Sequence, residues 1–250
     1  MLSTTVMSAQ EWATTAMEDM TRMTKYFNKD CMQGMKQYPD KYFDLAIVDP
    51  PYGISMDKGT SGFGHAKVRN YKGGWDSESP TAEYFEELMR VSKNQIIWGG
   101  QYMTEHLKSG TKWLVWDKVG ETEFQNPFSK CELAWTSFNG VVDKFVCRQM
   151  GFISDDKSKR IHPTQKPVAL YKWILVNYAK EGDIILDTHV GSASSLIACE
   201  ELGFDYVGFE IDEQYYQSSR QRMEERRAQI SLLDIDHFSL LDVEERRDSI

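Results

Sequence analysis

The sequence predicts an α/β fold in which a mainly parallel β-sheet carries helices on both faces. Short apolar runs, of which residues 43–48 (FDLAIV) are the clearest, are typical of strands buried on both faces of a parallel sheet. These runs alternate along the chain with segments of helical periodicity, as βαβ units require. The chain has 250 residues, of which 41% are hydrophobic, and this is enough to form one domain of this kind.

The first part of the chain supplies strands and helices in alternation. Ser8-Ala9-Gln10-Glu11 has the spacing of a capping box, which predicts a helix over residues 8–23. The next elements are expected to be a strand at 25–28, a helical turn from 30 to about 40, a strand at 43–48, a helix at 84–92 and a strand at 95–98. Six glycines within residues 53–75 predict a long loop, and loops of this length are usually functional.

The second part of the chain leads into a βαβ unit. Residues 112–116 and 131–138 are rich in Trp and β-branched residues and predict an antiparallel hairpin at the edge of the sheet. Pro167 is expected to begin a helix that runs through Tyr178 and stops at Gly182. A strand at 183–187, a helix at 192–202 and a strand at 205–210 then form the βαβ unit, and a charged helix follows over 213–230.

Composition argues against several classes of protein. No apolar run approaches the roughly 18 residues that a membrane span needs. The N-terminus lacks the basic start and apolar core of a secretory signal. The four cysteines are scattered without a C-x-x-C pair, which disfavours a disulfide framework or a zinc site, so we expect no bound metal. These features predict a soluble protein of the cytoplasm that does not associate with a membrane.

Charge is distributed unevenly along the chain. The net charge is −9, and residues 200–250 alone hold 14 Asp and Glu against 6 Arg. Residues 57–74 and 144–172, by contrast, are basic. Such segments suit a nucleic-acid partner, although ordinary solvated loops would show the same charge.

The βαβ unit carries acidic residues at the ends of both its strands. Asp187 ends the first strand, Gly191 lies in the turn that follows, and Glu210 ends the second strand. Their spacing is close to that at which a carboxylate meets ribose hydroxyls in nucleoside-binding βαβ units. Taken alone, the same residues would also suit an ordinary turn.

A second cluster follows the strand at 43–48 directly. In Asp49-Pro50-Pro51-Tyr52, the Asp49 carboxylate and the Pro50 carbonyl can both accept hydrogen bonds from one incoming amine. Tyr52 supplies a flat ring on which a heterocycle can stack. The alternative is a rigid turn between a strand and a loop. The position at a strand end, before a long basic loop, favours chemistry.

Three motifs in this order resemble a known family. Asp49-Pro50-Pro51-Tyr52, the run His162-Pro163-Thr164-Gln165-Lys166-Pro167 and the unit Asp187…Gly191…Glu210 look like those of the S-adenosylmethionine-dependent DNA amino-methyltransferases. The match is closest to the N6-adenine members whose catalytic half precedes the cofactor half, and it covers residues 25–225. The resemblance implies a Rossmann-like methyltransferase fold and methyl transfer to the N6 amine of a flipped-out adenine. The family includes the methyltransferases of restriction-modification systems.

The resemblance also assigns roles to individual residues. Asp49, Pro50, Pro51 and Tyr52 would form the catalytic motif, in which Asp49 and Pro50 hold the amine and Tyr52 stacks on the base. The residues expected around S-adenosyl-L-methionine are Asp30, Cys31, Asp49, Thr164, Lys166, Asp187, His189, Gly191, Ser192 and Glu210. Of these, Glu210 would bind the ribose, and Asp187 and Gly191 would line the methionine moiety. Thr164 and Lys166 would lie near the carboxylate of that moiety. Trp116 also lies in a segment that resembles the family, but we interpret it as core packing.

The partner implied is double-stranded DNA, and a homodimer or a partner subunit is left open. The residues expected to contact DNA are Lys58, Lys67, Arg69, Lys72, Lys157, Lys159 and Arg160. We interpret the chain as a single methyltransferase domain, with a catalytic half at 24–150 that contains the basic loop 53–75. A cofactor half at 151–230 and an acidic tail at 231–250 complete it.

The sequence departs from the family at the glycine turn. The family usually has Asp-Pro-Phe-x-Gly-Ser-Gly, whereas residues 187–193 read Asp-Thr-His-Val-Gly-Ser-Ala. His189 would either replace the Phe by packing on the cofactor or weaken cofactor binding. Three alternatives therefore stay open: N4-cytosine methylation, a non-catalytic cofactor- or DNA-binding subunit, and methylation of RNA or a protein amide. Asp rather than Ser at position 49 favours adenine.

Overall fold

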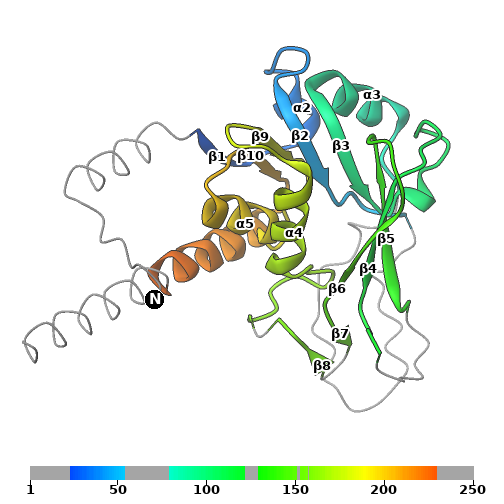
Figure 1. Ribbon diagram of the computed structural model, residues 1–250. Helices are drawn as coiled ribbons and strands as arrows, with labels where there is room; N and C mark the ends of the chain where they lie inside the picture. The colour runs from blue at the N-terminus through cyan, green and yellow to red at the C-terminus, as the bar shows by residue number, and fades with distance from the viewer. Residues whose placement is uncertain (1–22, 54–78, 122–128, 151–152, 157, 230–250) are drawn as a thin grey trace, which may run out of the picture.

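A single eight-stranded sheet organises the structure, a computed structural model that describes residues 23–53, 79–121, 129–150, 153–156 and 158–229 (Figure 1). The strand order is β1-β10-β9-β2-β3-β5-β4-β6. The bounds are β1 (Thr24–Asn28), β2 (Phe43–Val48), β3 (Ser92–Trp98), β4 (Trp113–Asp117), β5 (Cys131–Thr136), β6 (Asp143–Val146), β9 (Ile184–Asp187) and β10 (Asp205–Glu210). The predicted helix at 8–23, the loop 53–75 and the tail 231–250 lie almost wholly outside the described residues.

Five neighbouring strands of this sheet are parallel. β1, β10, β9, β2 and β3 all run in one direction, so their carboxyl ends meet at one edge. β5 is antiparallel to both β3 and β4, and this forms the predicted hairpin. β6, however, pairs with β4 outside the hairpin, so β6 and not the hairpin is the edge of the sheet. The four-residue β6 has only partly buried or exposed side chains, and so short a segment gives little periodic signal.

Helices cover both faces of the sheet, as the sequence predicts. α2 (Cys31–Met35) and α3 (Ala82–Val91) lie on one face, and α4 (Val168–Tyr178) and α5 (Ser194–Leu202) lie on the other. The helix over residues 213–229 continues from β10. On β2, Leu45 and Ile47 pack in the core beneath α4 and α5, whereas Ala46 and Val48 pack beneath α2 and α3. The apolar run 43–48 is therefore buried on both faces, as predicted.

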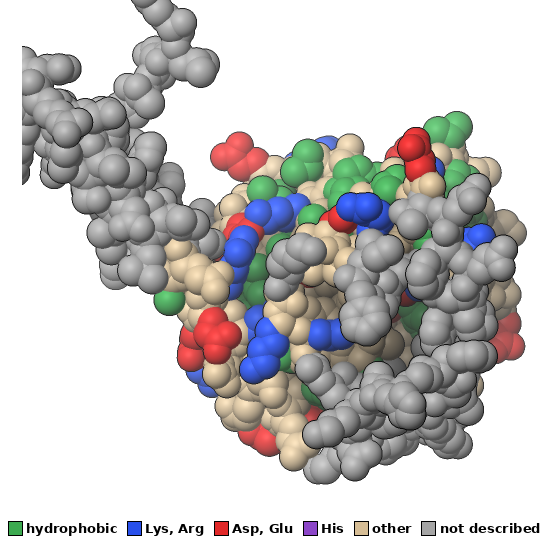
Figure 2. Space-filling view, turned by 90° about the horizontal axis from the view of Figure 1, so that it is seen from below, with side chains coloured by type: hydrophobic (Ala, Val, Ile, Leu, Met, Phe, Trp, Pro, Cys, Tyr) green, Lys and Arg blue, Asp and Glu red, His purple; other side chains and the backbone are tan. Residues whose placement is uncertain are grey.

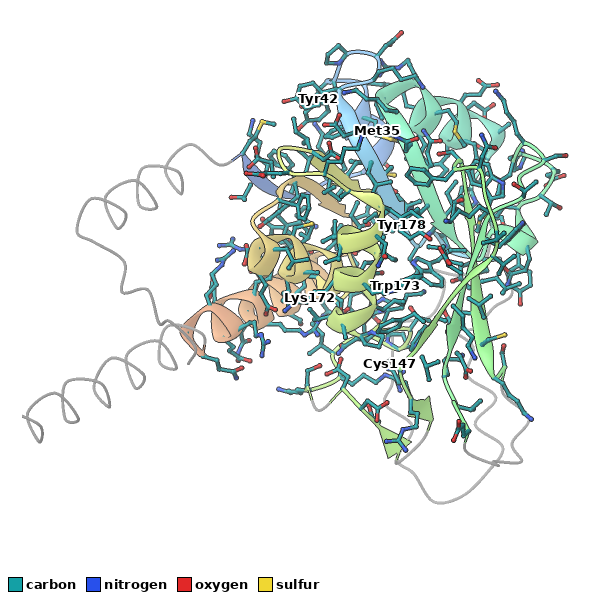
Figure 3. All side chains as sticks on the ribbon, in the orientation of Figure 1. Met35, Tyr42, Cys147, Lys172, Trp173 and Tyr178 are labelled. Atoms are coloured by element: carbon teal, nitrogen blue, oxygen red, sulfur yellow. The ribbon has the colours of Figure 1, made fainter. Side chains whose placement is uncertain are left out.

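Aromatic contacts join α4 to the far end of the sheet. Figure 3 shows Trp173 and Tyr178 on α4, on the side where the β4–β6 strands lie. The ring of Trp173 is 5.4 Å from that of Phe145 on β6, and the Tyr178 hydroxyl donates a hydrogen bond to Asp143. A small second sheet of β7 (Gln149–Met150) and β8 (Ile153–Ser154) follows β6. These contacts join the strands of residues 24–146 and the helices that follow them into one body.

Candidate active site at the carboxyl edge of the sheet

Four acidic residues lie where the parallel strands end. Asp30 follows β1, Asp49 follows β2, Asp187 ends β9 and Glu210 ends β10. Because these strands are neighbours and parallel, the four residues share one edge of the sheet. The structure thus brings together both clusters that the sequence separates by more than 130 residues.

Both oxygens of the Asp49 carboxylate are hydrogen-bonded within the chain. The Tyr52 hydroxyl donates to Oδ1 at 2.7 Å, and the Lys166 ammonium donates to Oδ2 at 2.5 Å. The side chain of Asp49 is only 17% exposed. Burial raises the pKa of Asp49, and Lys166 opposes this effect. The Asp49 carboxylate therefore sits in a largely water-excluded position at the end of β2.

Lys166 contacts two carboxylates of the chain, a pairing that the sequence did not predict. Its side chain is 2% exposed, and its ammonium is 3.2 Å from Glu132 on β5 as well as 2.5 Å from Asp49. Burial alone would lower the pKa of Lys166, but Asp49 and Glu132 outweigh it and the pKa lies above its ordinary value. The Lys166 carbonyl accepts a hydrogen bond from Ser194, which ties the 162–167 run to α5.

Glu132 and Lys118 are the functional candidates that sequence reasoning missed. Lys118 follows β4 and its ammonium lies 3.0 Å from Glu132. Burial raises the pKa of Glu132, but Lys166 and Lys118 hold it below its ordinary value. The one signal in the sequence was a lone carboxylate at the start of a strand that is otherwise apolar. Trp116, on the other hand, is 2% exposed and donates to the Cys147 carbonyl, which confirms its prediction as core.

The ring of Tyr52 lies in a narrow space beside β3. It stacks on Tyr102 of the 3₁₀ helix η2 (Gly100–Tyr102) at a centroid distance of 5.4 Å, with 25° between the ring planes. A Cβ added to Gly99 would come within 2.1 Å of the Tyr52 ring, and Gly99 has a φ of 70°. Glycine is therefore required here both for its φ and for the space it leaves to the ring.

On the side of the edge where the sequence predicts cofactor binding, the Glu210 carboxylate is hydrogen-bonded to the backbone and can still accept a further hydrogen bond. Glu210 accepts one backbone N–H on each oxygen, from Gly191 at 2.8 Å and from Asp212 at 2.9 Å. A carboxylate has about four acceptor positions, so Glu210 can still accept a hydrogen bond from a ligand hydroxyl. Gly191 has a φ of 53°, so a residue with a side chain would be strained at this turn. This donor and acceptor set fits a nucleoside that carries ribose hydroxyls, as the resemblance implies.

Burial changes the ionisation of two residues near this turn. Burial raises the pKa of Asp187 to about 7, although the hydrogen bonds from the Ser195 hydroxyl and the His189 N–H act to lower it. Burial lowers the pKa of His189 to about 4, so its ring is neutral at pH 7. The ring packs edge-on against Tyr84 at 5.4 Å, and its Nδ1 is 2.9 Å from the Thr188 hydroxyl.

The remaining cofactor candidates lie around the same edge. Asp30 caps α2 by accepting the Gln33 N–H at 3.0 Å, and Cys31 begins that helix. Ser192 is buried in the turn before α5. Thr164 lies in the 162–167 run, where its hydroxyl is 3.1 Å from His162 Nδ1. Their contacts with a cofactor stay predictions.

The predicted DNA contacts lie mostly outside the described part of the chain. Lys58, Lys67, Arg69, Lys72 and Lys157 fall among the residues that are not described. Lys159 and Arg160 are exposed, and Lys159 lines a hollow of about 520 Å³ together with Arg222 and Arg226. Figure 2 shows several Lys and Arg side chains on the face seen from below.

The described residues contain neither a membrane-spanning helix nor a cluster of metal ligands. No helix among them is long and apolar enough to cross a membrane. No group of three or more His, Cys, Asp or Glu side chains in that same part of the chain could hold a metal ion. The four cysteines, Cys31, Cys131, Cys147 and Cys199, are all free.

The chain is similar in sequence to known DNA methylases. Residues 115–221 match the N6/N4 methyltransferase family model, whose description is DNA methylase. The type II methyltransferase M.HpaI of Haemophilus parainfluenzae is 25% identical over 236 residues, with 78% of this chain and 72% of that protein covered. M.HinfI of Haemophilus influenzae is 24% identical, covering 78% and 67%. The putative methylase YubD of Escherichia coli is 21% identical, covering 80% and 90%.

Solved structures share the fold. The complex of M1.HpyAVI with S-adenosylmethionine has a TM-score of 0.50 and 20% identity, and covers 80% of this chain and 100% of that one. TTHA0409, a putative DNA modification methylase of Thermus thermophilus complexed with S-adenosylmethionine, has a TM-score of 0.52 and 13% identity, covering 81% and 95%. The cytosine-N4-specific PvuII methyltransferase has a TM-score of 0.51 and 12% identity, covering 82% and 92%. These likenesses confirm the predicted Rossmann-like methyltransferase fold.

Together, these comparisons make the chain similar in sequence and in fold to DNA methylases. The family covers both N6-adenine and N4-cytosine enzymes.

Proposed function

We propose that this protein transfers a methyl group from S-adenosylmethionine to the N6 amine of an adenine flipped out of double-stranded DNA. The observation that carries the proposal is the position of Asp49, a buried carboxylate at the end of β2, beside β9 and near the nucleoside-fitting turn. Asp49 and the Pro50 carbonyl would accept the two N–H groups of the amine. The compartment would be the cytoplasm, where bacterial DNA lies.

The chain's task in this reaction is to make a poor nucleophile attack. The lone pair of an aromatic amine is delocalised into the ring. Hydrogen bonds from both N–H groups, to Asp49 and to the Pro50 carbonyl, favour a tetrahedral nitrogen whose lone pair is localised. The fixed donor and acceptor geometry also supplies proximity, which contributes much of the rate in such reactions.

When bound, S-adenosylmethionine supplies a methyl group attached to a positively charged sulfur. The amine nitrogen forms a bond to the methyl carbon as the carbon–sulfur bond breaks, and its electrons stay with the sulfur. One proton then leaves the nitrogen. Asp49 would stabilise the positive charge that develops on the nitrogen and would take up this proton. Glu210 would bind the ribose of the cofactor, and Asp187 and Gly191 would line its methionine moiety.

Tyr52 would hold the flipped base. In the structure the Tyr52 hydroxyl donates a hydrogen bond to Oδ1 of Asp49, whereas Lys166 donates to Oδ2. An incoming amine would therefore exchange with this hydroxyl while the Tyr52 ring stacks on the base. A base inside a duplex cannot reach a pocket at the sheet edge, so it must flip out, at a cost of a few kcal/mol. Lys159 and Arg160 would contact the DNA backbone.

The acceptor base separates the proposal from its nearest alternative. We favour adenine because Asp, and not Ser, stands at position 49. N4-cytosine methylation would use the same amine chemistry. A non-catalytic subunit is disfavoured because the Asp49-Pro50-Pro51-Tyr52 motif is intact and partly buried, and a binding module has no need of it.

The test uses purified protein, methyl-labelled S-adenosylmethionine and unmethylated duplex DNA of mixed sequence, which is then digested to nucleosides. Label in N6-methyladenine is the expected result, and label in N4-methylcytosine would overturn the acceptor. Parallel reactions with RNA and protein test the remaining alternatives. Asp49→Asn should abolish transfer while cofactor binding persists, and Asp44→Asn, on the same strand but away from the edge, is the matched control.

A further inference from the structure

Four charged side chains of alternating sign form a row that ends at Asp49. Lys166 lies 2.5 Å from Asp49 and 3.2 Å from Glu132, and the other oxygen of Glu132 lies 3.0 Å from Lys118. Asp49 is the member of this row that would touch the acceptor amine. The other three charges lie behind it, on the hairpin and in the run before α4.

The backbone holds this row in place. Glu132 stands opposite Trp116 on β4, and Ala134, two residues further on, stands opposite Trp98 at the end of β3. The Lys166 ammonium lies over the Trp98 ring at 5.3 Å, and that ring belongs to a fully buried side chain. The positions of Glu132 and Lys166 therefore depend on strand pairing and packing, and not on mobile surface side chains.

Lys166 has two opposed effects on methyl transfer. By binding Oδ2 it fixes the rotation of the Asp49 carboxylate and leaves Oδ1 to the amine. Its positive charge, however, would oppose the positive charge that develops on the acceptor nitrogen, since like charges repel strongly where water is excluded. A second carboxylate on Lys166 removes this conflict, because it offsets the charge and leaves the hydrogen bond intact.

We propose that Glu132 is a positioning residue for methyl transfer, which holds Lys166 against Asp49 and offsets the charge of Lys166 at the acceptor amine. This inference rests on the proposed function and deepens it. Lys118 in turn keeps Glu132 ionised and in place. In this proposal Glu132 acts through Lys166 and Asp49.

The matched control is a carboxylate with the same kind of surroundings elsewhere. Glu201 on α5 also pairs with two basic side chains, Lys172 and Arg226, and its side chain is 7% exposed. Glu132→Gln keeps the shape of the side chain and removes its charge. Glu201→Gln makes the same change away from the carboxyl edge.

The first measurement is the single-turnover rate of methyl transfer at saturating cofactor and DNA. Glu132→Gln should lower this rate on the order of tenfold or more, with unchanged Kd for cofactor and DNA. Glu132→Asp should recover part of the rate, because it restores the charge. Glu201→Gln should leave the rate unchanged and alter only the Tm. Equal rates for wild type and Glu132→Gln, or equal losses in the two Gln variants, would overturn the proposal.

The second measurement does not depend on activity. In protein with ¹⁵N-labelled lysine, a buried ammonium that exchanges slowly with water should give a ¹H–¹⁵N signal, which Lys166→Arg identifies. This signal should shift or disappear in Glu132→Gln and in Asp49→Asn, and persist in Glu201→Gln. A Lys166 signal that is the same in wild type and in Glu132→Gln would show that Glu132 does not contact Lys166, and would overturn the proposal. If the wild type methylates no DNA while the signal follows Glu132, the proposed function fails but the charge row stands.

Discussion

One buried carboxyl, Asp187, should contribute stability that falls as pH rises. Burial raises its pKa in the folded protein to about 7, whereas an unfolded chain has an aspartate pKa of about 3.9. Between these values the folded state binds the proton and the unfolded state does not. At this site the unfolded state therefore binds fewer protons, and the contribution of Asp187 to the free energy of unfolding decreases as pH rises. The stabilisation is fully present below about pH 4 and is lost as pH rises through 7.

The magnitude follows from the two pKa values. Each pKa unit corresponds to about 1.4 kcal/mol, so the full effect is about 4 kcal/mol, of which roughly 3 kcal/mol falls between pH 5 and pH 8. Asp187→Asn removes the titration and keeps the shape. In the wild type the His189 N–H and the Ser195 hydroxyl both donate to the Asp187 carboxylate. In the variant the amide oxygen can accept from the His189 N–H, and the amide nitrogen can donate to the Ser195 oxygen.

The assay is urea unfolding of wild type and Asp187→Asn at pH 5, 6, 7 and 8 without cofactor, with the free energy extrapolated to water. The free energy of unfolding of the variant, relative to that of the wild type, should increase by roughly 3 kcal/mol from pH 5 to pH 8. Asp183→Asn, just before β9, controls for the loss of a negative charge near the same strand. Wild-type and Asp187→Asn curves that stay parallel from pH 5 to pH 8 would refute the reasoning.

Three further predictions concern the site and its support. Gly99→Ala should lower the methyl-transfer rate at least tenfold without weakening cofactor binding, because the added Cβ would lie 2.1 Å from the Tyr52 ring. Single-turnover rates and equilibrium binding of the cofactor measure the two effects. Tyr52→Phe should retain methyl transfer, since it keeps the ring and removes the hydroxyl that occupies Asp49, whereas a loss as deep as that of Tyr52→Ala would contradict the exchange. Gly208→Ala should destabilise the protein by about 1–3 kcal/mol in urea unfolding, because the new Cβ would lie 2.8 Å from Val190, and an unchanged midpoint would count against this packing.

Much of the sheet could be predicted because its strands carry local signals. Residues 43–48 and 205–210 are short, mostly apolar runs flanked by turn residues, and the structure places β2 and β10 there. Helices α4 and α5 also begin and end within two residues of the predicted positions. In each case the pattern that reveals the element is also what buries it, so sequence and packing agree. β6, with four residues and little burial, has no such pattern and was missed.

In the candidate site, too, some features could be predicted from the sequence and others depend on the tertiary structure. The sequence alone determined which residue types could hold an amine and a nucleoside, because Asp49-Pro50-Pro51-Tyr52 and the Asp187 to Glu210 unit are contiguous motifs next to strand ends. Only the tertiary structure decided that Lys166 meets Asp49 across 117 residues and that Glu132 joins them from another strand. Such a pairing depends on strand order and register, which bring distant residues together. An ion pair of this kind leaves no periodic trace in the sequence that encodes it.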